Sequence, residues 1–448
     1  MNEDSGDEGV KKEIEKWQTL VHVCRRWRSV VFGSPRRLNL RLVCTTGTPA
    51  RDTLDVWPSL PLLIQDSGNR TENVDDFIAV LERSDCVVEI HLGILDGSDL
   101  ENVLAEMQVP FPELTDLQLS SEDGMESVVP DSFLGGSAPR LQFLWLDRIP
   151  FPGLPNLLLS AAHLVTLHLE NIPHFGYISP EAMVTALSTL TSLERLSLEF
   201  EDPPPHPDRE SRRPPPLTRC VLPVLTYFCF EGFDEYLDDI VACIDIPQLR
   251  TLKISFFDQT AFDLPQFIQF VSRTPTLKAF EKAQVRFTHD TSSVNLSSQT
   301  PGYGTLDVQI QCMELDWQVS SMEQVCTSCL PPLSTLEDLY IYEYLYSELV
   351  WQDDIEDALW LDLLHPFAAV KNLYLSEKFA SHIMPALQEL DVGGTTEVLP
   401  TLQNIFLEEH QLSGTVRACI QQFIATRQAT SHPVAVSRWD RDQSKFMY

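Results

Sequence analysis

The chain has 448 residues, which is too long for one compact core, and 43% of them are hydrophobic, as is usual for folded proteins. Its 65 acidic residues outnumber its 32 basic residues and give a formal net charge of −33. A negative field of this size argues against nucleic acid or a membrane as a general partner and favours a basic protein partner.

The beginning of the chain predicts an intracellular protein. Residues 1–16 are acidic and then of mixed charge, and we expect them to form a disordered tail. They lack the basic segment and apolar stretch of a secretory signal, and no apolar run approaches the roughly 18 residues of a membrane span. We expect the protein in the cytoplasm or the nucleus, with its ten cysteines as thiols.

An amphipathic helix is predicted after this tail. Apolar side chains recur at helical spacing and form one stripe, which consists of Trp17, Leu20, Val23, Cys24, Trp27 and Val31. His22, Arg25, Arg26 and Arg28 form a basic face, and the Gly33-Ser34-Pro35 sequence ends the helix. Two interpretations remain open: the stripe caps the first repeat of the following domain, or it binds a separate protein.

A six-residue pattern, L-x-x-L-x-L with apolar substitutes, recurs along most of the chain. Its copies begin at Leu60, Val87, Leu114, Leu141, Leu164, Leu193, Leu225, Leu249, Leu277, Leu306, Leu336, Val370 and Leu402. They lie about 23 to 34 residues apart, close to the spacing of leucine-rich repeats. The end of each copy alternates as a strand does, which places alternate leucines in the core and the intervening residues on a concave face.

The segments between copies predict helices. Apolar residues recur at spacings of three and four after Val74, Pro180 and Leu264. One strand and one helix per repeat predict an α/β leucine-rich-repeat solenoid over residues 46–412, with parallel strands on the concave side and helices on the convex side. The ninth repeat position, usually Asn or Cys, is often apolar here, as in Ile149, Ile172, Phe233 and Phe257, so we expect irregular curvature.

Two segments depart from the repeat rhythm. Residues 202–217 are rich in proline and charge, and we expect an exposed loop, with a proline-rich ligand for a partner's aromatic groove as the alternative. Residues 413–448 follow the last copy and are predicted to form a C-terminal cap.

The sequence V-C-R-R-W-R-S-V, residues 23–30, resembles the final part of an F-box, which ends in V-C-R-x-W-R-x-hydrophobic. The continuation VVFGSPRRLNLRL and the closing ATRQATSHPVAVSRWDR resemble fungal, basidiomycete-type F-box proteins in which leucine-rich repeats follow. The resemblance covers essentially the whole chain and assigns residues 17–45 to the C-terminal half of an F-box-like segment. The first half, with its L-P-x-E motif, has no counterpart in residues 1–16, so the F-box is incomplete.

This resemblance implies a substrate receptor of an SCF-type (cullin–RING) ubiquitin ligase. The helical stripe from Trp17 to Val31 would contact the Skp-type adaptor, and the repeats would capture an unknown protein target. The incomplete F-box leaves a second hypothesis open: a leucine-rich-repeat scaffold or recognition protein that has lost adaptor binding. An in-frame L-P-x-E segment upstream of Met1 would favour the first hypothesis and indicate a truncated gene model.

The sequence offers no catalytic constellation, so we predict a protein that is not an enzyme. It contains no G-x-S-x-G, H-E-x-x-H or G-x-x-x-x-G-K-[ST] motif, and we expect no cofactor. Cys326 and Cys329 form a lone C-x-x-C without the second pair that a zinc site needs, and no metal is expected. The acidic run 353–357 is typical of a solvated helix face.

Function is therefore expected on the concave surface. Large or charged side chains occupy the position between the two last leucines of several copies, where they have no predicted core role. We predict that these residues bind the partner, since aromatic side chains are enriched in binding hot spots: Trp145, His168, Lys253, Tyr340, Tyr374 and Phe406.

Overall fold

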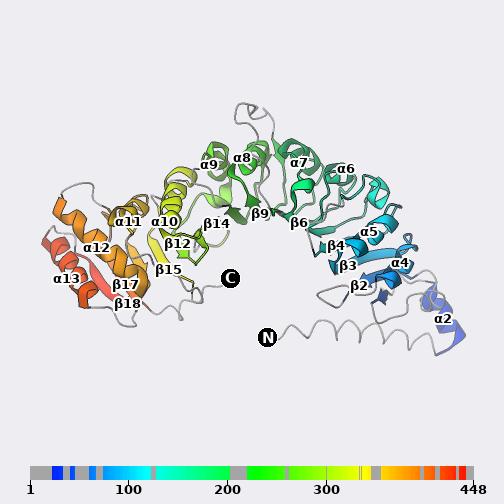
Figure 1. Ribbon diagram of the computed structural model, residues 1–448, viewed down its shortest axis with the longest axis horizontal. Coiled ribbons are helices and arrows are strands. Elements are labelled where there is room, and N and C mark those ends of the chain that lie inside the picture. The colour runs from blue at the N-terminus through cyan, green and yellow to red at the C-terminus, as the bar shows by residue number, and fades with distance from the viewer. Residues whose placement is uncertain are drawn as a thin grey trace. The chain divides into compact units, whose positions relative to one another are not determined.

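The computed structural model divides the chain into two compact units, which are Met1–Pro207 with Cys220–Leu225 and Asp208–Arg219 with Thr226–Tyr448. It describes residues 23–33, 41–45, 60–66, 74–122, 128–201, 219–257, 262–298, 300–331, 333, 335–344, 355–393, 398–408, 414–429 and 433–439 (Figure 1). The predicted tail 1–16, the proline-rich loop 202–217, Trp17 and Leu20 lie outside these residues.

The first unit is a parallel sheet with helices on one of its faces (Figure 1). Its strands lie side by side in chain order: β1 (Leu42–Cys44), β2 (Leu62–Gln65), β3 (Val87–Leu95), β4 (Asp116–Ser121), β5 (Phe143–Asp147), β6 (Thr166–Ile172) and β7 (Arg195–Phe200). The short β8 (Cys220–Val221) also belongs to this unit. The helical elements are α2 (Arg25–Phe32), α4 (Asp75–Leu81), α5 (Gly97–Glu106), η1 (Phe133–Gly136), α6 (Leu154–Leu158), η2 (His174–Gly176) and α7 (Pro180–Leu187).

The predicted repeat phase is confirmed from β3 to β7, whereas in β2 it is shifted by one residue, because Ile64 rather than Leu63 pairs with Ile90. Leu117, Leu144, Leu167 and Leu196 pair in register across successive strands, and none of the four side chains is exposed. A single repeat cannot bury such leucines, so the stacking of neighbouring strands creates the core.

The ninth position of the repeat is apolar at β5 and β6 for a local reason. Arg148, directly after β5, and Asn171, next to the last residue of β6, have φ values of 54° and 50°, in the left-handed region that residues other than glycine rarely occupy. The chain turns sharply there, and the next residues, Ile149 and Ile172, point back into the core with 5% and 7% exposure. Apolar packing at this turn replaces the asparagine that the repeat usually has.

The second unit also has strands on one side and helices on the other (Figure 1). Its main sheet has the order β9-β11-β14-β13-β12-β15-β16-β17-β18. The strands are β9 (Tyr227–Gly232), β10 (Ile244–Asp245), β11 (Thr251–Phe256), β12 (Lys282–Phe287), β13 (Thr291–Ser297), β14 (Thr305–Gln311), β15 (Asp338–Glu343), β16 (Asn372–Leu375), β17 (Asn404–Glu408) and β18 (Ala435–Trp439). The helices are α8 (Asp234–Cys243), α9 (Pro265–Arg273), η4 (Pro275–Leu277), α10 (Leu315–Gln324), the π-helical η5 (Val325–Cys329), α11 (Asp357–Leu364), α12 (Glu377–Gly393) and α13 (Gly414–Ala429).

An antiparallel meander interrupts this sheet. β13 runs antiparallel to both β12 and β14, so β11 pairs with β14 rather than with β12, the next long strand in the sequence. The prediction of a strand in the copy that begins at Leu277 was wrong: Leu277 ends η4, and the strand starts at Lys282. The reason is the alternation of buried Ala283, Val285 and Phe287 with half-buried polar residues, which outweighs the spacing of the leucines.

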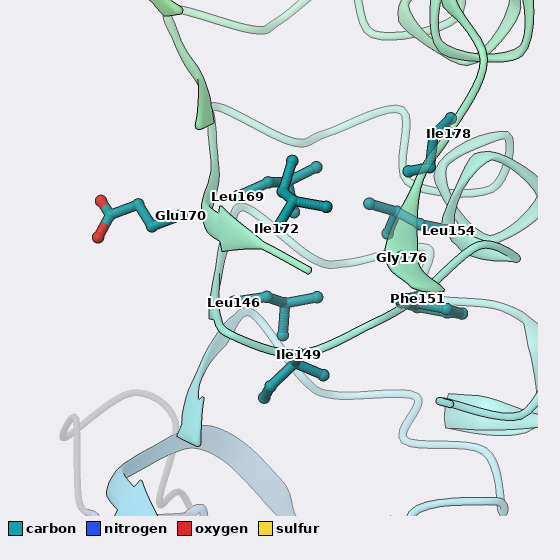
Figure 2. A pocket seen from close by; sticks show the side chains of 9 residues that line it. All are labelled: Leu146, Ile149, Phe151, Leu154, Leu169, Glu170, Ile172, Gly176 and Ile178. Atoms are coloured by element: carbon teal, nitrogen blue, oxygen red, sulfur yellow. The ribbon is translucent and has the colours of Figure 1, made fainter. Parts of the chain in front are cut away.

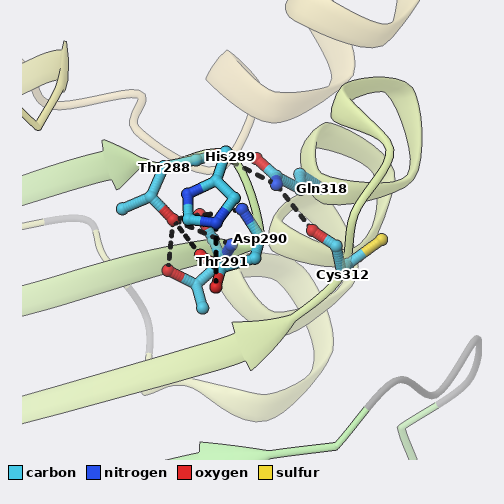
Figure 3. Close-up of polar contacts among 6 residues, drawn as sticks. All are labelled: Thr288, His289, Asp290, Thr291, Cys312 and Gln318. Carbon is cyan, nitrogen blue, oxygen red and sulfur yellow. Dashed lines mark hydrogen bonds and ion pairs between the residues drawn. The ribbon is translucent and has the colours of Figure 1, made fainter. Parts of the chain in front are cut away.

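A buried glutamine fixes the turn of this meander. Gln318 of α10 is 1% exposed, and its amide Nε2 donates to the carbonyl oxygens of Thr288, at 3.2 Å, and Cys312, at 2.6 Å (Figure 3). Within the turn, the Thr288 hydroxyl accepts hydrogen bonds from the backbone N–H groups of Asp290 and Thr291 (Figure 3). One side chain thus connects the turn between β12 and β13 to the end of β14.

Buried carboxylates connect α8 to α9. Asp238 is 3% exposed and accepts hydrogen bonds from the backbone N–H groups of Gln266, at 2.8 Å, and Phe267, at 2.9 Å. Both N–H groups belong to the first turn of α9, which has no intrahelical acceptors for them. Asp238 therefore caps α9 from the preceding repeat, a role that its place in the middle of α8 does not suggest.

The neighbouring Asp234 is 2% exposed and accepts a hydrogen bond from the Asp263 N–H at 3.2 Å. Burial raises its pKa to about 7, and a hydrogen bond with Glu235 adds to the effect. The fold thus keeps a proton on this pair of carboxyl groups near neutral pH.

Candidate functional site

Each unit has an open sheet face opposite its helices, and the predicted partner-binding residues lie there. In the first unit, Gln118, Trp145, His168 and Ser197 pair in register across β4 to β7. In the second, Tyr340, Tyr374 and Phe406 pair in register across β15 to β17. The structure therefore brings Trp145 beside His168 and the three aromatic residues beside one another, while Lys253 lies apart from them, exposed on β11 between Cys229 and Asp307.

Trp145 and His168 share a carboxylate that the sequence analysis missed. The Nδ1 atom of His168 lies 3.4 Å from the Oε1 atom of Glu170, and the Trp145 side chain also hydrogen-bonds to this carboxylate. The hydrogen bond from His168, the largest cause, and that from Trp145 lower the pKa of Glu170, against the opposing effect of burial. The Glu170 carboxylate is consequently charged at neutral pH, with the His168 imidazole beside it.

Asp147, one strand away, has a different environment. It is 9% exposed, accepts hydrogen bonds from Ser120 Oγ and Asn171 Nδ2, both at 2.7 Å, and lies 3.6 Å from the Arg148 guanidinium. These contacts occupy its oxygen atoms and balance its charge, so Asp147 holds the turn after β5 rather than facing a partner.

On the second unit, the predicted aromatic residues form a stack. The ring centroids of Tyr340 and Tyr374 are 4.0 Å apart and those of Tyr374 and Phe406 are 4.4 Å apart, with interplanar angles of 6° and 9°. The Lys282 ammonium lies 4.2 Å from the centroid of the Tyr340 ring, a cation–π contact. We call the rings of Tyr340, Tyr374 and Phe406 the aromatic stack.

Trp439 covers the aromatic stack. Its ring centroid lies 5.8 Å from those of both Tyr340 and Tyr374, at angles of 66° and 71°, and the side chain is only 6% exposed. Burial, followed by the proximity of Tyr374, raises the pKa of Tyr340 above its usual range. The stack thus has a packing role within the chain, which the prediction of free binding residues did not include.

A polar ladder runs beside the stack on the same strands, two residues before each stacked ring. The side-chain amide of Asn404 donates to Asn372 Oδ1 at 2.8 Å, and that of Asn372 donates to Asp338 Oδ1 at 2.7 Å. Next to the meander, Arg286 Nη2 contacts Asp307 Oδ2 at 3.1 Å. The open face of the second unit is therefore polar along one row and aromatic along the next.

The helix α2 presents an apolar side to solvent. Trp27 and Val30 are 51% and 57% exposed, and their spacing of three residues places them on one side of the helix. Val23, two residues before the helix begins, is 63% exposed. Cys24 is also exposed, and its sulfur accepts a hydrogen bond from the Trp27 N–H at 3.5 Å. Of Val31, another predicted contact residue, the structure describes only the helical backbone.

One hollow lies behind β5 and β6, on the core side of the sheet. It spans about 240 Å³, part of it open solvent, and is lined by Leu146, Ile149, Phe151, Leu154, Leu169, Glu170, Ile172, Gly176 and Ile178. The Glu170 carboxylate points away from this space, and the remaining lining residues are apolar (Figure 2). The hollow therefore lacks the convergent polar groups that characterise small-molecule sites.

Within the described part of the chain, no group of three His, Cys, Asp or Glu side chains could hold a metal ion. Cys326 and Cys329 are buried, and burial raises the pKa of the Cys329 thiol to about 12. No helix in the same ranges is long and apolar enough to cross a membrane.

Parallel strands stacked in register, with helices on the opposite face, define an α/β leucine-rich-repeat solenoid, a fold that binds proteins. No family model and no curated protein matches the sequence. Solved structures similar to the chain include the leucine-rich-repeat protein LegL7 from Legionella pneumophila, with 11% identity and a TM-score of 0.28, covering 86% of this chain and 97% of that one.

An internalin (inlF) from Listeria monocytogenes has 12% identity and a TM-score of 0.27, covering 84% of this chain and 86% of that one. A structure of the complex of Rad7 and Elc1 in yeast has 14% identity and a TM-score of 0.26, covering 90% of this chain and 92% of that one. TM-scores this low carry no argument about function, and the fold of this chain rests on its own strand pairing.

Proposed function

We propose that this chain is a non-enzymatic substrate receptor of a cullin–RING ubiquitin ligase. In this role the open faces of the repeats bind a protein target, and the N-terminal helical segment binds a Skp-type adaptor. The observation that carries the proposal is the exposed apolar side of α2, in a sequence that resembles the end of an F-box.

The exposure of α2 favours binding over capping. A helix that caps a repeat domain buries its apolar side against the first strands, and buried tryptophan is the rule for such packing. Trp27 instead keeps 51% of its surface exposed, and Val30 keeps 57%. An apolar helix side of this kind fits a hydrophobic groove on a partner protein.

The mechanism is proximity rather than chemistry by this chain. A target held on the open faces and an adaptor held at residues 17–31 are connected by one protein, which raises the effective concentration of the target at the ligase. The residues proposed for adaptor contact are Trp17, Leu20, Val23, Cys24, Trp27 and Val31, and those proposed for target contact are Trp145, His168, Lys253, Tyr340, Tyr374 and Phe406.

A binding assay with purified Skp-type adaptor tests the proposal. We expect the full chain to retain the adaptor in a pull-down, and Trp27→Ala to weaken retention at least tenfold, since it removes the largest exposed apolar side chain of α2. Arg25→Ala, on the other side of the same helix, is the matched control and should bind as the parent chain does. Equal retention of both variants would contradict the assigned contact side.

The resemblance to an F-box covers only its final part, which leaves a second candidate, a leucine-rich-repeat scaffold without adaptor binding. The same assay separates the two functions. A chain that shows no adaptor binding, while a version extended upstream by an L-P-x-E segment does bind, would indicate the receptor role for the extended protein only.

A further inference from the structure

We propose that Trp145 and Glu170, on the open face of the first unit, bind an arginine side chain of a basic partner segment. This inference deepens the proposed function, since it names the chemistry of the target that the repeats would recognise. It rests on the geometry of a single carboxylate beside an indole ring, in a chain of net charge −33.

The first step concerns the orientation of Glu170. His168 and Trp145 come from neighbouring strands in register, and both direct a ring nitrogen towards the same carboxylate. Long acidic side chains on a surface usually lose entropy on binding, but this carboxylate is already fixed. A preorganised carboxylate of 28% side-chain exposure is suited to accept a partner's N–H groups.

The second step concerns charge. Among the described residues, no lysine or arginine side chain pairs with Glu170, whereas Arg148 lies beside Asp147 and Arg41 pairs with Glu89. His168 and Trp145 are the groups that interact with the Glu170 carboxylate. A guanidinium from a partner would add a positive charge that does not depend on the protonation of His168.

The third step concerns the surface around it. Strands β3 to β7 carry one basic open-face residue, Arg195, and, besides the buried Asp147, four acidic ones, which are Glu89, Asp116, Glu170 and Glu199. Phe143, whose ring centroid lies 6.3 Å from that of His168, adds an aromatic neighbour. The face is therefore acidic and aromatic, which complements a basic segment rather than an acidic or apolar one.

Arginine fits this site better than lysine. A guanidinium is planar, so it can lie on the face of the half-buried Trp145 ring while its N–H groups reach the carboxylate of Glu170. An ammonium ion makes either contact well, but it has no flat surface to place on the indole. We therefore expect a preference for arginine that charge alone does not produce.

Fluorescence anisotropy with labelled peptides tests the inference on the full chain. The probes are glycine-spaced peptides of equal length with three arginines, three lysines, three citrullines or three glutamates. Citrulline matches the shape of arginine without its charge. We expect binding in the order arginine, lysine, then citrulline, with no binding of the glutamate peptide.

Two variants that each remove one negative charge distinguish binding at Glu170 from general electrostatic attraction of the peptide to the acidic face. Glu170→Gln and Glu199→Gln each remove one negative charge from the same face, and Glu199 accepts a hydrogen bond from its neighbour Ser197. We expect Glu170→Gln to weaken arginine-peptide binding at least tenfold and Glu199→Gln to weaken it less than twofold. Trp145→Leu should weaken the arginine peptide and remove its advantage over the lysine peptide.

Three outcomes would overturn the inference: equal effects of the two glutamine variants, equal binding of the citrulline and arginine peptides, or no arginine-peptide binding at about 1 mM. Thermal unfolding of each variant checks that the first unit remains folded. Adaptor retention through α2 is measured on the same variants, so a failure of the arginine site and a failure of the proposed receptor role give different results.

Discussion

Replacement of Trp439 by alanine should release β18 from the second unit. Ala435, Val436, Ser437 and Arg438 are exposed, so Trp439 supplies most of the side-chain packing of this strand. The backbone of β18 pairs with β17 alone within the described residues, because β18 is the last strand of the sheet. Its attachment therefore depends mainly on Trp439 and on one ladder of hydrogen bonds, with the buried Val434 directly before the strand.

The magnitude follows from the burial of the indole ring. Truncation of a buried tryptophan to alanine costs about 3–5 kcal/mol, which includes the cost of the cavity that remains. Here the ring lies on an open sheet face, where water can refill the space, so we expect the lower value of about 3 kcal/mol. The loss falls on β18 and the aromatic stack rather than on the whole unit, because terminal strands open locally.

Amide hydrogen exchange of residues 433–439 measures this loss directly. A local destabilisation of about 3 kcal/mol accelerates exchange roughly 100-fold, at a factor of ten for each 1.4 kcal/mol. Val436→Ala, in the same strand at 38% exposure, is the control and should change exchange less than threefold. Equal exchange in the parent chain and in Trp439→Ala would refute the packing role assigned to the indole.

Three further outcomes are expected. The second unit should lose about 2–3 kcal/mol of stability as the pH rises from about 5 to 8, because the Asp234 pKa of about 7 exceeds its unfolded value of about 3.9, so the folded state holds a proton that the unfolded state has released. Urea unfolding of Asp234→Asn should show a smaller pH dependence. Asp238→Ala should destabilise α9 by about 3 kcal/mol, since two buried N–H groups lose a charged acceptor, while Asp238→Asn, which keeps one acceptor oxygen, should cost less; chemical denaturation compares the two. A thiol reagent should modify the exposed Cys24 quickly and the buried Cys329 only after unfolding, because burial raises the pKa of the Cys329 thiol to about 12. Mass spectrometry of the labelled peptides measures the order, and faster labelling of Cys329 would contradict its burial.

The repeat pattern in the sequence was sufficient to predict most of the sheet. Leucines at fixed spacing can be buried only when neighbouring copies pair in register, and Leu144 and Leu167 do so. The helices expected after Val74, Pro180 and Leu264 are present as α4, α7 and α9. Local periodicity works here because each repeat contacts mainly its neighbours.

The meander could not be predicted from the same pattern. Its strands carry few leucines, and β13 (T-S-S-V-N-L-S) alternates without matching the repeat. The polar-apolar alternation of residues 282–287 was a signal that a strand begins later than Leu277. The hydrogen bonds of Gln318, which fix the turn, come from a helix that follows the meander in the sequence.

The candidate site was predicted in part. Strand alternation correctly placed Trp145 and His168 on the open face, and the same rule, extended by two residues, would have found Glu170. Trp439 was missed because its strand lies beyond the last repeat copy, although A-V-S-R-W also has the apolar residues of a short strand.

The meander has a consequence for the order in which the second unit folds. In a regular solenoid, each new strand pairs with the strand made just before it, so the sheet grows in step with synthesis. Here Thr251 of β11 pairs with Thr305 of β14, so the edge of β11 stays unpaired until β12 and β13 have also been synthesised. A ribosome stalled before Thr305 would hold a chain with an open strand edge, the kind of surface on which chains aggregate and chaperones act.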